Sequence, residues 1–256
     1  MKNNRSLLMS IRTIKAVLVA TALISLLVKA GGNGVVEAIK HPQRLEADKL
    51  RDEVRKPQKV LQFFEVKKKQ RILDVFSGGG YYSELLSRIV GEEGSVVAHN
   101  NQAYLPYAKK ELALRQYQKR LPNVEVVISE ADDLKLDLNS FDQIFFVLGY
   151  HDMYYHEKGW NRIHQDDFMK TLYAALKPGG TIAIIDHQAK AGTGSASAQK
   201  LHRIDKDFVI AEMEKAGFIW KSELLLLINS NDDYEKSVFD PAIKGKSSRF
   251  VLKFSK

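Results

Sequence analysis

The feature that most constrains this sequence is a short apolar segment, residues 72–76, that runs into three consecutive glycines at 78–80. An amphipathic stretch at 81–90 follows at once, which predicts a strand, a loop and a helix in direct succession. Glycine permits positive φ and leaves no Cβ in the path of a ligand, and the first turn of a helix presents unpaired N–H groups. The loop is therefore a candidate site for an anionic group, with Asp74 available for a cation or a hydroxyl.

Strand and helix patterns alternate along most of the chain, which predicts an α/β doubly wound fold with a mostly parallel sheet covered on both faces. The expected strands are residues 72–76, 95–98, 124–129, 141–148 and 181–185, and the expected helices are 81–90, 104–121, 166–176 and 204–216. Residues 223–228 and 249–254 are expected to form a closing hairpin.

The first thirty residues resemble an export signal in composition. A basic stretch ending at Lys15 precedes an apolar run at 16–28, which is shorter than the roughly 20 residues of a membrane span. We expect cleavage after Ala30 and a periplasmic location, with an uncleaved membrane anchor as the alternative. Residues 31–69 are expected to form an N-terminal helical cap on a main domain at 70–256.

Charge and composition exclude several kinds of site. The formal charge is +8, but five of the 39 basic residues and none of the 31 acidic ones fall in residues 1–30, so the rest carries only +3. That balance provides no basic footprint for nucleic acid. The chain has no cysteine, which excludes disulfides, thiolate nucleophiles and cysteine metal sites.

Three classes of ligand compete for the glycine loop. A phosphate loop would need Gly-Lys-Ser/Thr at its end, whereas Tyr81 follows the last glycine. A dinucleotide fingerprint is weakly supported, because Ser83 stands at the third glycine position and Asn100 stands where an acidic residue is expected. The third class is S-adenosylmethionine (SAM).

Here a family resemblance becomes specific. Residues 72–83 resemble motif I of class I SAM-dependent methyltransferases, residues 140–144 resemble the entry to their fourth strand, and residues 176–181 resemble the turn into their fifth. The resemblance implies a seven-stranded Rossmann-like sheet with a reversed last strand. Four further segments resemble predicted bacterial methyltransferases that carry signal peptides, namely residues 150–152, 186–187, 201–205 and 239–243.

The resemblance also implies roles for residues at the strand ends. The methionine part of SAM would be held by Asp74, Gly78, Gly79 and Gly80, the ribose by Asn100, and the adenine by Glu130, Ala131 and Asp132. Two positions depart from the family, which usually has glycine at Phe76 and a carboxylate at Asn100. Asparagine lacks the charge-assisted hydrogen bond of a carboxylate, so these departures predict weakened SAM affinity or a different ligand in the loop.

Histidines at the expected strand ends are the candidates for catalysis. His151 and His187 could move a proton or orient a substrate, and Asp152 or Asp186 could orient them in turn. The expected substrate contacts are Tyr154, Tyr155, Trp160, His202 and Arg203, with Arg203 either gripping an acidic group or pairing with Asp205 or Asp207 at a helix start. No His-Glu-x-x-His spacing occurs, so no metal site is predicted.

The favoured hypothesis is SAM-dependent methyl transfer to a small-molecule acceptor. The alternatives are a non-catalytic binding protein on the same fold and, less strongly supported, a metal-assisted hydrolase that uses the histidines. On the favoured hypothesis, Gly80→Val is expected to abolish SAM binding, because it would place a branched side chain in the path of the ligand.

Overall fold

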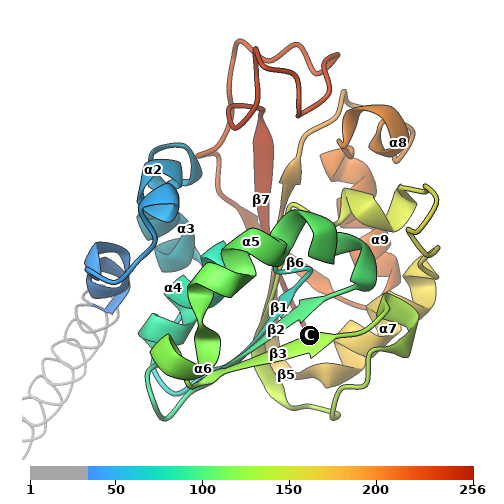
Figure 1. Cartoon of the computed structure of the whole chain (residues 1–256). Helices are drawn as coiled ribbons and strands as arrows, with labels where there is room; N and C mark the ends of the chain where they lie inside the picture. The colour runs from blue at the N-terminus through green and yellow to red at the C-terminus, as the bar shows by residue number, and fades with distance from the viewer. Residues whose placement is uncertain (1–33) are drawn as a thin grey trace, which may run out of the picture.

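The computed structural model describes residues 34–256, so the predicted export signal lies outside the described residues. Residues 34–40 are helical and are followed by α2 (Glu46–Arg55) and α3 (Pro57–Phe63). This N-terminal segment lies beside the sheet domain (Figure 1). Among residues 34–256, no helix is both long enough and apolar enough to cross a bilayer.

The centre of the molecule is a seven-stranded sheet in the order β3-β2-β1-β4-β5-β7-β6. Its strands are β1 (Arg71–Val75), β2 (Ser95–Asn100), β3 (Val124–Ile128), β4 (Phe141–Val147), β5 (Leu176–His187), β6 (Ile219–Glu223) and β7 (Arg249–Ser255). The first five are parallel, and β7 runs antiparallel between β5 and β6. This order confirms the predicted doubly wound sheet with a reversed last strand, and it places the carboxyl ends of β1, β2 and β4 at one edge.

Helices cover both faces of the sheet (Figure 1). They are α4 (Tyr81–Val90), α5 (Leu105–Arg115), α6 (Tyr117–Arg120), α7 (Gln165–Ala175), α8 (Ala198–Leu201) and α9 (Lys206–Lys215), with one-turn helices η1 (Gln102–Tyr104), η2 (Ala131–Asp133) and η3 (His151–Tyr154). The central strand β4 buries Ile144, Phe145 and Phe146 completely. Phe146 packs in the core on one face and Phe145 in the core on the other, as a strand covered on both sides requires.

The long helix predicted at 104–121 is broken in the structure. Gln116 adopts φ 46° between α5 and α6, although no glycine or proline marks the break. The break accompanies two buried side chains, Arg115 and Tyr117, both of which lie against the glycine loop. The tertiary contacts of these neighbours account for a break that the helical pattern did not indicate.

The closing hairpin is also displaced from its predicted position. The structure places β6 at Ile219–Glu223 rather than at 223–228, because Ile219 pairs with Ser255 and Glu223 with Leu252. The apolar residues after Glu223 continue beyond the strand as irregular chain. Ile219 and Trp220 are both exposed on this edge strand. The strand therefore lacks the alternation of apolar and polar residues by which a half-buried strand is recognised in a sequence.

The predicted turn before the fifth strand lies within β5 as a bulge. Leu176 pairs with Phe141, whereas the next paired residue, Thr181, lies opposite Gln143. The intervening residues 177–180 include Gly179 at φ 74°. Glycine tolerates this conformation, so the chain leaves the pairing register and returns to it within one strand.

Candidate active site

The glycine loop between β1 and α4 has one glycine that faces open space. A Cβ added to Gly78, which has φ 55°, would have no other atom within 4 Å. A Cβ on Gly79 would meet the Glu111 carboxylate at 2.3 Å, and one on Gly80 the Tyr117 hydroxyl at 1.8 Å. Gly80 is therefore required for packing, which corrects the expectation that Gly80→Val would act by blocking a ligand.

Asn100, the residue expected at the ribose, is bonded to the loop itself. The Gly78 N–H donates to Asn100 Oδ1 at 2.8 Å, and Asn100 Nδ2 donates to the Gly78 carbonyl and the Ser77 hydroxyl, both at 3.1 Å. A carboxylate has no N–H group and could not make the last two bonds. The amide is therefore suited to shaping the loop, and a ribose contact would have to replace one of these bonds.

Phe76 stands where the family usually has glycine, and its side chain packs into the core. It adopts φ 48°, and its side chain is buried in a stack with Tyr104, 5.1 Å between ring centroids. The Trp160 ring packs on Tyr104, 5.3 Å between ring centroids, and the Tyr104 hydroxyl donates to Asp152. The result is an aromatic layer that crosses the carboxyl ends of β1, β2 and β4.

Asp74 points into the protein rather than into open space. Ser83 Oγ donates to it at 2.6 Å, and burial raises the pKa of Asp74 to about 7 despite that hydrogen bond. The three residues expected at the adenine are placed at the end of β3. Glu130 accepts the Gln102 N–H at 3.3 Å, Ala131 is buried, and Asp132 is exposed and pairs with His164.

A buried cluster of histidine and aspartate side chains lies beyond the carboxyl ends of β4 and β5. His151 Nδ1 donates to Asp186 Oδ1 at 2.8 Å, and the His151 backbone N–H donates to the other oxygen of the same carboxylate. His151 Nε2 lies 3.2 Å from Asp152 Oδ1, and His202 Nδ1 lies 3.8 Å from that same oxygen. The structure thus brings together two of the predicted catalytic residues and one predicted substrate residue.

The two predicted catalytic histidines are driven toward opposite protonation states. Burial alone would lower the pKa of His151, but the charges of Asp152 and Asp186 outweigh it and raise that pKa well above its usual value. Burial lowers the pKa of His187 well below its usual value, and the positive charge of His151 lowers it further. These shifts favour the protonated form of His151 and the neutral form of His187.

Aromatic side chains form a wall next to the cluster. The His202 ring lies 4.6 Å from Tyr155 and 4.8 Å from Phe239, measured between centroids. Trp160 lies 5.2 Å from Tyr155 and joins this wall to the Tyr104 stack. Phe239 was not singled out from the sequence, although it lies in one of the segments that carried the narrower family resemblance.

Two residues predicted at the substrate lie elsewhere. Arg203 is completely buried, and its guanidinium donates to both oxygens of Asp232 and to the Gln188 carbonyl, so it holds loops together instead of gripping a substrate. The Tyr154 hydroxyl donates to Glu212 on α9, and its ring packs against Phe208 of the same helix. The helix-start pairing proposed for Arg203 is likewise replaced by Asp232, which is far away in sequence.

The residues present are compatible with SAM at this edge. Gly78 leaves room beside the loop, and residues 77–79 are only half-buried. Within residues 34–256, four buried polar atoms near the strand ends have no hydrogen-bond partner: His99 Nδ1, Asn101 Nδ2, Ser129 Oγ and Trp160 Nε1. Such atoms are costly unless a ligand or water meets them, so they mark where the polar edges of a bound nucleoside would be accommodated.

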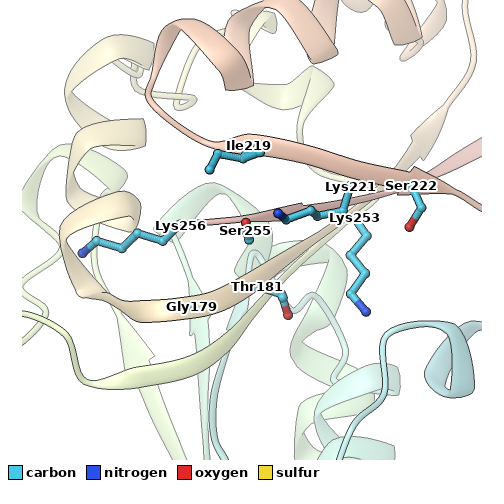
Figure 2. Close-up of a pocket in the computed structure, with 8 residues that line it drawn as sticks. All are labelled: Gly179, Thr181, Ile219, Lys221, Ser222, Lys253, Ser255 and Lys256. Carbon is cyan, nitrogen blue, oxygen red and sulfur yellow. The ribbon is translucent and has the colours of Figure 1, made fainter.

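A cavity of about 510 Å³ lies at the opposite edge of the sheet, between β5, β6 and β7. Figure 2 shows Lys221, Lys253 and Lys256 around it. Lys253 pairs with Glu65 at 2.6 Å, and Lys256 donates to the Leu176 carbonyl at 2.7 Å, so two of the three ammonium groups already have partners. This cavity is remote from the glycine loop and is not part of the candidate active site.

Comparison with known proteins is consistent with this geometry. A family model described as "Methyltransferase domain" matches residues 66–242. The chain is 31% identical over 122 residues to a ubiquinone/menaquinone biosynthesis C-methyltransferase UbiE from Haemophilus ducreyi, a match that covers 47% of this chain and 42% of that relative. The chain therefore spans less than half the length of the curated relatives it matches.

Solved structures share the fold. A SAM-dependent methyltransferase from Aquifex aeolicus has a TM-score of 0.58 at 26% identity, covering 80% of this chain and 92% of that one. Phosphoethanolamine N-methyltransferase 2 from Haemonchus contortus, solved in complex with SAM, has a TM-score of 0.52 at 17% identity, covering 77% and 50%. The second likeness shows the fold alone.

Proposed function

We propose, because this chain belongs to the class I SAM-dependent methyltransferase family, that it transfers a methyl group from SAM to a small-molecule acceptor bound beside His151 and His187. The observation that carries the proposal is the open face of Gly78 in a motif I loop that meets α4 at its N-terminus. SAM, when bound, supplies a methyl group that is already activated, so the protein has mainly to align the acceptor and exclude water.

The cofactor would be held by the loop and by the unpartnered polar groups at the strand ends. Gly78 gives access to the backbone of the loop, and Asn100 keeps the loop in shape. Asn101 Nδ2 and Ser129 Oγ are available for the adenosine part. Calorimetry with SAM tests this directly. The absence of both binding heat and thermal stabilisation at saturating SAM would refute the proposal.

The aromatic wall supports an acceptor with a flat ring. Tyr155, Trp160 and the exposed Phe239 offer apolar faces, and the histidine cluster beside them offers polar groups for a hydroxyl or an amine. The names of the quinone-biosynthesis relatives are in keeping with a small aromatic acceptor. Transfer of labelled methyl from SAM to a panel of phenols and aryl amines would identify the class.

The opposed histidines support a division of roles. His187 Nδ1 lies 2.8 Å from Ser247 Oγ. In the tautomer in which Nδ1–H donates to that hydroxyl, Nε2 keeps a lone pair and can take the proton that the acceptor loses. His151, held as a cation between Asp152 and Asp186, would orient the acceptor. The sequence hypothesis treated both histidines as equal candidates, whereas this assignment gives them different roles.

We expect His187→Gln to lower kcat by roughly 100-fold or more, as loss of a general base does. Because the pKa of His187 lies below 6.5, wild-type activity should stay level near neutral pH and fall only as acid protonates His187. The variant should lose that acid limb. His156→Ala is the matched control, since His156 is an exposed histidine in the irregular chain after η3. An unchanged acid limb in His187→Gln would show that another group is the base.

We also propose that the chain is exported, on the basis of the basic and apolar pattern of residues 1–30. Fractionation followed by N-terminal sequencing of the mature chain tests this. A mature chain that begins at Gly31 supports cleavage, and an intact chain in the membrane fraction supports the anchor.

A further inference from the structure

The cluster beyond β4 and β5 has the composition of a metal site that the sequence spacing did not indicate. His151, Asp152 and His202 each offer one ligand atom, and these atoms all lie within 4.8 Å of one another. His202 is about fifty residues away from the other two in sequence. We propose that these three side chains bind one divalent first-row metal ion, of the zinc type, with a position left open for a further ligand.

The separations are close to those that a metal ion requires. Nitrogen and oxygen ligands bound to zinc at about 2.0–2.2 Å in tetrahedral geometry stand roughly 3.4 Å apart. Asp152 Oδ1 lies 3.2 Å from His151 Nε2 and 3.8 Å from His202 Nδ1. The three ligand atoms all lie within 4.8 Å of one another, and the His202 side chain, 18% exposed, offers a route to solvent.

The groups around the ligands hold them as supporting residues do in metal sites. His151 donates Nδ1–H to the fully buried Asp186 at 2.8 Å, which directs Nε2 toward Asp152. A carboxylate on the far nitrogen is the usual way in which proteins orient a ligating imidazole. The Tyr104 hydroxyl donates to the other oxygen of Asp152, so each of these two ligands has a partner that fixes it.

His202 is held by packing and by its backbone. Its ring lies between Tyr155 and Phe239, and it adopts φ 53° at the end of α8, a conformation that few side chains other than glycine accept. The charges also balance, because two buried carboxylates, Asp152 and Asp186, with two neutral imidazoles would neutralise a divalent ion.

Metal titration of the untagged full chain, stripped with chelator and without SAM, tests the inference independently of methyl transfer. We expect one equivalent of Zn²⁺ by calorimetry, with a Kd on the order of 1 μM or tighter. Co²⁺ should bind at the same stoichiometry and give visible absorption bands of low-coordinate cobalt. Wild-type binding weaker than about 1 mM would overturn the proposal.

Variants separate ligands from bystanders. His202→Ala should weaken Zn²⁺ binding at least about 100-fold, and Asp186→Asn about 10- to 100-fold with the stoichiometry unchanged. His156→Ala, which removes a nearby exposed imidazole, should leave the affinity unchanged. Circular dichroism establishes that each variant is folded, and His202→Asn replaces His202→Ala if the latter is not. Equal affinity in wild type and the folded His202 variant would refute the site, whatever the outcome with SAM.

Discussion

Replacing Gly78 with asparagine is expected to lower the affinity for SAM by at least about 100-fold and to leave the unfolding free energy nearly unchanged. Asparagine tolerates the positive φ of 55° at this position, and its side chain would enter the open space beside the loop. No protein atom there has to move, so the cost falls on the ligand. Calorimetric titration with SAM and urea denaturation measure the two effects.

The matched control for this change is Gly179→Asn. Gly179 also has positive φ, 74°, and open space around it, but it lies in the β5 bulge at the opposite edge of the sheet. The Gly179→Asn variant should bind SAM with the affinity of the wild type. By contrast, any side chain at Gly80 collides with Tyr117 and should destabilise the fold. Normal SAM affinity in Gly78→Asn would place the cofactor elsewhere.

Replacing Arg115 with methionine is expected to lower the unfolding free energy by about 3–5 kcal/mol. Its guanidinium is completely buried and pairs with Asp48 on α2 and Glu84 on α4, while Nε donates to the Gly79 carbonyl at 2.6 Å. Methionine keeps most of the volume but leaves two buried carboxylates without this cation. The loss should appear as a lower midpoint concentration of urea denaturation with an unchanged m-value.

Lys170→Met is the control, because it removes one positive charge from an exposed ion pair instead of a buried one. Lys170 and Asp167 form an exposed pair one turn apart on α7, and such pairs contribute little to stability. The change in unfolding free energy should stay within about 0.5 kcal/mol. A loss below about 1 kcal/mol in Arg115→Met would mean that the cations already paired with these carboxylates, Arg51 with Asp48 and both Arg88 and Arg120 with Glu84, are sufficient.

Arg115 also connects the N-terminal segment to the glycine loop. Its partner Asp48 belongs to α2, and Arg51 of the same helix reaches Glu111, the residue that packs against Gly79. The described part of the predicted helical cap is therefore tied to the loop by buried charges. Loss of Arg115 should accordingly weaken SAM binding as well as stability.

Local pattern was enough to predict most of the architecture. The apolar stretch of β4, the glycines after β1 and the proline and glycines at the start of β5 each act over a few residues, so their effects can be read without knowing the partners. The same information located the carboxyl ends of the strands, and hence the edge at which the ligand is expected.

Local sequence pattern gave wrong predictions where contacts with residues distant in sequence determine the local structure. Gln116 breaks a helix because of what Arg115 and Tyr117 contact, and β6 is located by its pairing with β7. Arg203 next to Asp205 suggested a local ion pair, yet the structure pairs it with Asp232. In each case the energy that decided the outcome belongs to a contact across the fold.

The sequence by itself determined the order of most strands and helices and the position of the glycine loop, because apolar periodicity and glycine act through the local backbone, and its motifs carried the resemblance to the family. Only the tertiary structure decided that Gly78 rather than Gly80 faces open space, that Asn100 hydrogen-bonds to the loop, and that His202 joins His151 and Asp152. Those outcomes depend on side-chain distances between strand ends, and such distances exist only after the sheet has assembled.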